Sequence, residues 1–145
     1  MLVDAGAVRE NSRCKVVDCR GFTDPQKGSR RHLGMHPDNL ANIVRHEKFP
    51  EFFRKLRSQL CGKLESAVGK SLYIVCYCRK GAHRSTAIAT LTQNVLQQDS
   101  GMKDEYNLRI LPIRHMSKEA KVWEQDYCGE CKQCRQFSLK RTGCS

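Results

Sequence analysis

The chain has 145 residues, 39% of them hydrophobic and 28% charged, a composition typical of a globular domain rather than a low-complexity chain. No apolar run approaches the ~20 residues that a membrane-spanning helix needs, and no signal-peptide core stands at the N-terminus, so we expect no membrane partner. The net charge of +11 favours a polyanionic partner, with RNA the first candidate, or a basic rim around a small phosphorylated ligand.

The nine cysteines do not resemble a secreted disulfide framework, because their number is odd and many lie in apolar segments. Five lie in or beside apolar runs, where reduced thiols commonly lie: Cys14, Cys19, Cys61, Cys76 and Cys78. The other four crowd the last part of the chain: Cys128, Cys131, Cys134 and Cys144. We therefore expect an intracellular, reducing compartment, either the cytoplasm or the interior of an organelle.

The order of apolar patterns predicts an α/β domain with a small parallel sheet and flanking helices. Alternating or continuous apolar runs predict strands, and apolar residues at helical spacing predict helices. The expected strands are 14–19, 71–77 and 106–113, and the expected helices are 38–46, 50–68, 85–98 and 117–123. This order divides the chain into a flexible leader (1–12), an α/β domain (13–126) and a basic, Cys-rich tail (127–145).

The most informative segment joins the second predicted strand to the helix after it. It reads Cys78, Arg79, Lys80, Gly81, Ala82, His83, Arg84 and Ser85. A turn of this kind directs backbone N–H groups towards one point, and the positive end of the following helix dipole adds to them. Arg84 supplies a permanent positive charge beside those groups. The segment is typical of a loop that binds a tetrahedral anion, most often phosphate.

Residues from two other segments are expected at the same edge of the sheet. Asp18 and Arg20 follow the first predicted strand, and Arg114 and His115 follow the third. Because parallel strands end at the same edge, and ligands bind there in open α/β sheets, we expect these side chains to line the anion site.

The spacing Cys78-x5-Arg84 is similar to the phosphate loop of cysteine-dependent phosphatases. The resemblance implies Cys78 as nucleophile and Arg84 as phosphate ligand, with Asp18, Asp24 or Asp38 as a candidate general acid. Less specific interpretations stay open. Cys78 can be a small apolar residue at a strand end, Arg84 can form an ion pair with Asp18 or Glu119, and Asp18 can be the partner of Arg20.

A second resemblance covers roughly residues 14–120. It is carried by Asp18-Cys-Arg20, Arg31-His-Leu-Gly-Met35, Cys78-Arg-Lys-Gly-Ala-His-Arg-Ser85 and Arg114-His115. In this order the motifs resemble the C-terminal domain of the RapZ (RNase adaptor protein) family. The resemblance implies a pocket for glucosamine-6-phosphate or a related phosphosugar or nucleotide sugar, and contact with a small RNA.

The implied pocket residues are Asp18, Arg20, Cys78, Gly81, His83, Arg84 and Ser85. Within the loop, Arg79 and Lys80 stand where the family has Thr and Gly, which adds positive charge and removes flexibility. The family's nucleotide-binding P-loop signature does not occur in this chain, so ATP chemistry of that kind is not expected. We therefore expect a non-catalytic binding domain, with the phosphatase as the alternative.

The Cys-rich tail indicates a second site. Cys128, Cys131 and Cys134 form two overlapping C-x2-C steps, and Cys144 follows. Four thiols can form a tetrahedral zinc centre, and His115 can replace Cys144 as the fourth ligand. An iron–sulfur cluster and a tail without metal are the alternatives. A zinc-stabilised interaction module is thus a third functional hypothesis.

Overall fold

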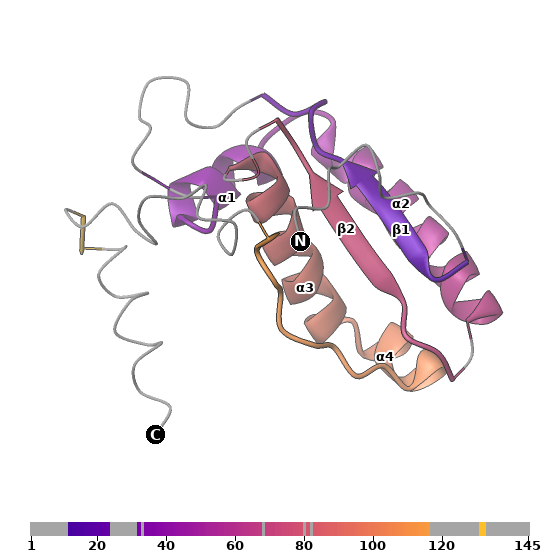
Figure 1. The fold of residues 1–145 in the computed structure, drawn as a ribbon. Coiled ribbons are helices and arrows are strands. Elements are labelled where there is room, and N and C mark those ends of the chain that lie inside the picture. The colour runs from indigo at the N-terminus through magenta and orange to yellow at the C-terminus, as the bar shows by residue number, and fades with distance from the viewer. Residues whose placement is uncertain are drawn as a thin grey trace.

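The fold is described by a computed structural model for residues 12–23, 32, 34–67, 69–79, 81, 83–116, 131 and 132. In these residues two parallel strands and four helices form an α/β fold (Figure 1). The elements in chain order are β1 (Cys14–Asp18), α1 (Pro37–Val44), α2 (Phe49–Ser66), β2 (Tyr73–Tyr77), α3 (Arg84–Gln98) and α4 (Ser100–Tyr106).

The two strands pair in parallel, as the sequence predicts. Cys14 lies opposite Tyr73 and Asp18 opposite Tyr77, and the Cys19 N–H extends the pairing by donating to the Tyr77 carbonyl at 2.9 Å. In Figure 1, α2 passes behind β1 and α3 runs alongside β2. The buried core between them consists of Val17, Cys19, Phe22, Ile43, Leu56, Leu60, Ala87, Ile88 and Met102.

The predicted helices over 38–46, 50–68 and 85–98 are confirmed to within two residues by α1, α2 and α3. Helix α1 begins after His36, whose Nδ1 accepts a hydrogen bond from the Asp38 N–H at 3.2 Å. Helix α2 buries Leu56 and Leu60, one turn apart, while Arg57, Ser58 and Gln59 between them are exposed.

The predicted third strand over 106–113 is wrong. Asp99 caps a new helix, α4, by accepting a hydrogen bond from the Met102 N–H at 3.0 Å, and Met102 fills the core. Asn107 ends α4 in the left-handed conformation (φ 48°), and residues 107–115 then follow an irregular path. Pro112 removes one backbone donor from this segment, which is a further reason why it forms no ladder.

Other predictions fall outside the described residues: the helix over 117–123, the leader except residue 12, and the tail except Cys131 and Lys132. No helix in the described part of the chain is both long and apolar enough to span a bilayer.

Candidate functional site

The edge where both strands end carries an ion pair and a tyrosine. The Arg20 guanidinium donates two hydrogen bonds to the Asp18 carboxylate, from Nη2 to Oδ2 at 2.7 Å and from Nε to Oδ1 at 2.9 Å. The same guanidinium lies 5.2 Å from the centre of the Tyr77 ring and reaches its hydroxyl at 3.3 Å. Asp18 is therefore the partner of Arg20, which is one of the interpretations that the sequence leaves open.

This pairing determines the charge of the strand edge. Hydrogen bonds from Arg20 hold the pKa of Asp18 far below its usual value, and Asp18 raises the pKa of Arg20 in turn. The neighbouring carboxylate, together with burial, raises the pKa of Tyr77. An Asp18 that stays ionised accepts hydrogen bonds well, but it has no proton to give as a general acid at neutral pH.

The turn between β2 and α3 is described at Cys78, Arg79, Gly81 and at the residues from His83 onward. Gly81 adopts a φ of 66°, which glycine tolerates at no steric cost, and its carbonyl accepts a hydrogen bond from Thr86 Oγ1 at 3.1 Å. The Ala87 N–H donates to the His83 carbonyl at 2.8 Å, so α3 begins directly behind the turn. Lys80 and Ala82 lie outside the described residues.

Gly34 supports this turn from behind. A side chain at this position would collide with the His83 carbonyl, and it would lie 2.7 Å from the Ala87 nitrogen and 2.8 Å from Thr86 Cβ. The segment before α1 therefore packs its bare backbone against the first turn of α3. The position of the turn before α3 depends on this close approach.

Cys78 and Ser85 close the loop across its base. The Cys78 Sγ lies 3.2 Å from the Ser85 Oγ, and Ser85 is buried whereas Cys78 is half-buried. If the Ser85 hydroxyl donates to the sulfur, it stabilises the thiolate form of Cys78. If the Cys78 thiol donates to the hydroxyl oxygen, Cys78 is neutral.

Arg84 points into the protein. Its Nη1 donates to the backbone carbonyls of Arg20 and Phe22, both at 3.1 Å, which joins the loop after β1 to the start of α3. Its Nε is buried and has no hydrogen-bond partner among the described residues. The alternative ion pair of Arg84 with Asp18 is not formed, because Asp18 binds Arg20 instead, and Glu119 lies outside the described residues.

The other predicted ligand residues that the structure describes are Arg79, Arg114 and His115. Arg79 is exposed, and Arg114 and His115 follow the irregular segment rather than a strand. Gln93 Nε2 donates to the Leu111 carbonyl at 3.0 Å, and Figure 1 shows the segment running back along α3 towards the loop. The segment therefore lies along α3, although the predicted strand is absent from residues 107–115.

The sequence interpretation missed a second cluster. The ligand atoms of His32, His36 and Cys131 all lie within 4.8 Å of one another. Of the four tail cysteines proposed as metal ligands, Cys131 alone is described, and its partners are histidines from the segment before α1. The spacing His32-x3-His36 is the signal that could have revealed them.

Burial favours the neutral form of His36. His36 is 4% exposed, and burial, followed by the nearby His32, lowers its pKa, with Asp38 opposing the shift. A neutral imidazole is the form that binds metal ions.

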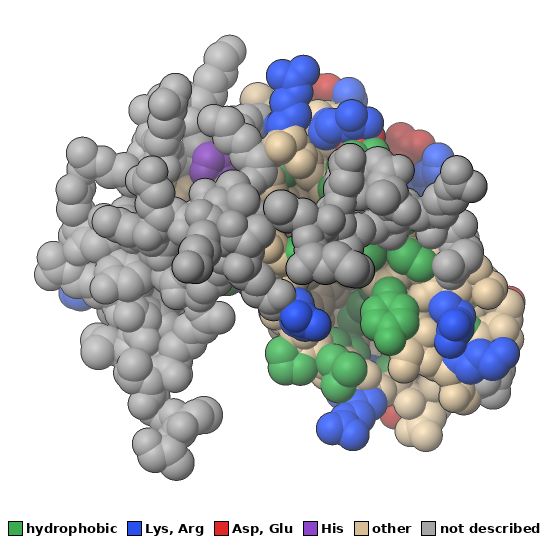
Figure 2. All heavy atoms as spheres, in the orientation of Figure 1, with side chains coloured by type: hydrophobic (Ala, Val, Ile, Leu, Met, Phe, Trp, Pro, Cys, Tyr) green, Lys and Arg blue, Asp and Glu red, His purple; other side chains and the backbone are tan. Residues whose placement is uncertain are grey.

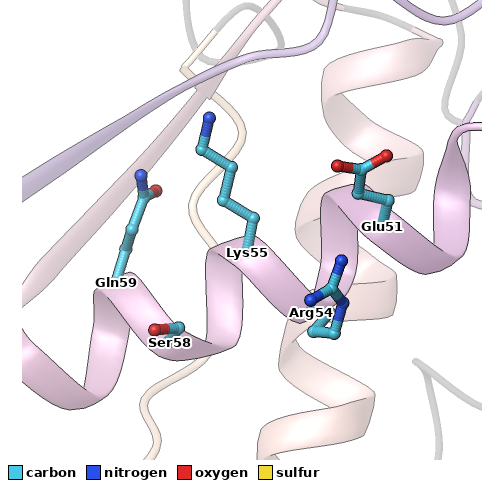
Figure 3. Close-up of a pocket in the computed structure, with 5 residues that line it drawn as sticks. All are labelled: Glu51, Arg54, Lys55, Ser58 and Gln59. Atoms are coloured by element: carbon cyan, nitrogen blue, oxygen red, sulfur yellow. The ribbon is translucent and has the colours of Figure 1, made fainter.

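A hollow of about 340 Å³ lies elsewhere, on the surface of α2 (Figure 3). Its lining comes from one helix alone: Glu51, Arg54, Lys55, Ser58 and Gln59. It contains no residue of the Cys78–Ser85 loop and brings no second segment to a ligand, so it is not the candidate site.

No protein-family model, curated protein or solved structure matches the chain. The interpretation of the site therefore depends on the geometry of its own residues.

Proposed function

We propose that this chain is a non-catalytic binding domain of the RapZ C-terminal type, which holds a phosphorylated ligand at the Cys78–Ser85 loop. The observation that carries the proposal is the buried Nε of Arg84, which has no partner among the described residues. An unsatisfied buried donor costs about 1–3 kcal/mol, and more when the group is charged. A bound oxyanion would remove that cost.

The orientation of Arg84 supports this assignment. Because Nη1 is engaged by the carbonyls of Arg20 and Phe22, the guanidinium is fixed in place before a ligand arrives. Its opposite edge, formed by Nε and Nη2, has the spacing that receives two oxygens of a phosphate in parallel hydrogen bonds. Backbone N–H groups at the start of α3 complete an anion site of the helix-terminus kind.

The ion pair at the strand edge favours a sugar phosphate over a free phosphate. Asp18 offers carboxylate oxygens beside the loop, and such oxygens accept hydrogen bonds from hydroxyl or ammonium groups. A phosphosugar or nucleotide sugar carries both kinds of group next to its phosphate. The exposed Arg79 adds positive charge at the rim.

The phosphatase alternative lacks its acid among the described residues at this edge. Asp18 is held ionised by Arg20, Asp38 lies at the start of α1 beside His36, and Asp24 lies outside the described residues. A loop that binds phosphate without a protonated acid can hold an ester but expels an alcohol slowly. We therefore assign recognition rather than hydrolysis.

RNA contact through the basic surface is the secondary part of the proposal. On the face drawn in Figure 2, the described Lys and Arg side chains lie in separate small groups rather than in one continuous patch. This distribution suits local phosphate contacts better than a long nucleic-acid track. If RNA binds, its affinity falls steeply with rising salt, which a filter-binding series measures.

The test uses the full chain. Addition of glucosamine-6-phosphate or a uridine diphosphate sugar raises the melting temperature, whereas the unphosphorylated sugar does not. The Nε–H resonance of Arg84, identified by its loss in Arg84→Lys, moves when the phosphosugar is added. Arg84→Lys weakens binding roughly tenfold or more, because one ammonium cannot replace a two-point contact. Arg54→Lys, on the exposed face of α2, is the matched control.

Two results would overturn the proposal. One is hydrolysis of an aryl phosphate that disappears in Cys78→Ser, which identifies a phosphatase. The other is an Arg84 Nε–H resonance that no phosphorylated compound moves.

A further inference from the structure

We propose that His32, His36 and Cys131 bind a zinc ion together with one further thiol, from Cys128 or Cys134. This mixed site of two histidines and two cysteines differs from the four-cysteine site that the tail alone suggests. It also stands independently of the anion loop, because it uses other residues. Its evidence is the approach of two imidazoles and one thiol from segments far apart in the sequence.

The distances suit a tetrahedral ion. Ligand atoms that lie roughly 2.0–2.3 Å from a tetrahedral zinc are about 3.3–3.8 Å from each other. Cys131 Sγ lies 3.4 Å from His36 Nε2, within that range. The His32 and His36 rings are stacked edge to face with centroids 3.9 Å apart, and all three ligand atoms fall within 4.8 Å. A small contraction around an ion would complete the three-ligand geometry.

The surroundings of His36 fit a metal ligand. Its Nε2 faces Cys131, and its Nδ1 lies 3.7 Å from Oδ2 of Asp38. A metal on Nε2 requires a proton on Nδ1, and the Asp38 carboxylate is placed to accept that proton's hydrogen bond. The present bond from the Asp38 N–H to Nδ1 would then break. Asp38 is 75% exposed, so its side chain can turn towards the ring.

The protein backbone holds the histidines in place. Asn39, which is 1% exposed, donates from its side chain to the His32 carbonyl at 3.3 Å and from its backbone to the His36 carbonyl at 2.9 Å. Both histidines are thereby attached to the first turn of α1. Preorganised ligands of mixed nitrogen and sulfur type favour zinc over magnesium or calcium, which prefer oxygen.

The fourth ligand follows from the sequence. Cys128 and Cys134 each stand three residues from Cys131, and a C-x2-C step lets both thiols reach one metal ion. The histidines have the complementary spacing His32-x3-His36. Cys144 and His115 are not needed for a complete set.

The site would stabilise the anion loop from behind. Gly34 lies between the two histidines in the sequence, and its backbone packs against His83 and Ala87. A zinc ion that fixes His32 and His36 therefore fixes the segment on which the start of α3 rests. The role that we assign to the metal is structural.

The first experiment uses the unmodified full chain, purified without chelators. Inductively coupled plasma mass spectrometry gives about one zinc per chain. X-ray absorption at the zinc edge resolves a shell of two nitrogens near 2.0–2.1 Å and two sulfurs near 2.3 Å. This measurement needs no variant, so it stays decisive even if the substitutions disturb folding.

The second experiment compares variants. The double change His32→Gln and His36→Gln reduces the zinc content at least fivefold, as does Cys131→Ser. The matched controls His46→Gln and Cys61→Ser leave it unchanged, since neither residue belongs to the cluster. A shell of four sulfurs, or zinc lost in Cys144→Ser but kept in the histidine variant, would overturn the proposal in favour of an all-cysteine site. Zinc below about 0.2 per chain in the unmodified protein would remove the metal altogether.

Discussion

The Sγ of Cys78 and the Oγ of Ser85 lie 3.2 Å apart, across the base of the turn that joins β2 to α3. The contact links the end of the parallel sheet to the first turn of the helix behind it. Because Ser85 is buried, its hydroxyl has few alternatives to the sulfur, and the loop is held closed at this point. The chemistry of Cys78 therefore depends on Ser85.

Replacement of Ser85 tests which atom donates. We expect Ser85→Ala to slow the alkylation of Cys78 by iodoacetamide about three- to tenfold, because the hydroxyl no longer stabilises the thiolate. Peptide mapping by mass spectrometry follows Cys78, with Cys61 on α2 as the internal reference. Faster alkylation in the variant would mean that the hydroxyl accepts the thiol proton instead.

A pair of glycine substitutions tests the close approach behind the loop. Gly34→Ala forces a side chain into the His83 carbonyl and the Ala87 amide, so we expect a loss of about 1–3 kcal/mol in the free energy of unfolding. Gly62→Ala, inside α2 with open space around it, stabilises the protein by about 1 kcal/mol. Urea unfolding measures both. Equal effects of the two changes would contradict the packing at Gly34.

Low pH should reduce the contribution of the Asp18–Arg20 ion pair to folding stability. Its folded pKa lies below the usual 3.8, so its contribution to stability is complete above that value and declines as the pH falls towards the folded pKa. We expect Asp18→Asn to lower the urea midpoint at pH 6 and to lower it less at pH 3. Asp104→Asn, an exposed change on α4, is the control. A midpoint difference that does not shrink in acid would contradict the pairing with Arg20.

The presence of helix α4, rather than a strand, can be tested through the burial of Met102. Met102 is 1% exposed in the core, so Met102→Ala should cost about 2–5 kcal/mol in the free energy of unfolding. Met116, which is 46% exposed, should tolerate the same change with a loss of less than about 0.5 kcal/mol. Thermal or urea unfolding compares the two. A pairing of 106–113 with β2 would instead give β-sheet amide signals across that segment.

The local sequence pattern was sufficient to predict those strands and helices whose conformation is set mostly by residues within the same segment. The two strands and helices α1, α2 and α3 lie close to their predicted bounds, because apolar periodicity within each segment matches the face that it buries. The strand–turn–helix unit at Cys78–Ser85 was likewise readable, since Gly81 must supply the positive φ at the turn. The prediction of a strand over 106–113 was wrong. The Asp99 cap and the buried Met102 favour helix α4, and they outweigh the β-type residues that follow.

The sequence by itself determined the basic charge, the order of the first strands and helices, and the strand–turn–helix unit around Cys78–Ser85, because composition and local pattern set all of these. The tertiary structure decided which side chains meet. Arg84 bonds to a carbonyl 64 residues away rather than to Asp18, and Cys131 meets His36 across 95 residues. Such contacts depend on how the packed core positions distant segments, and no periodicity in a local window records that.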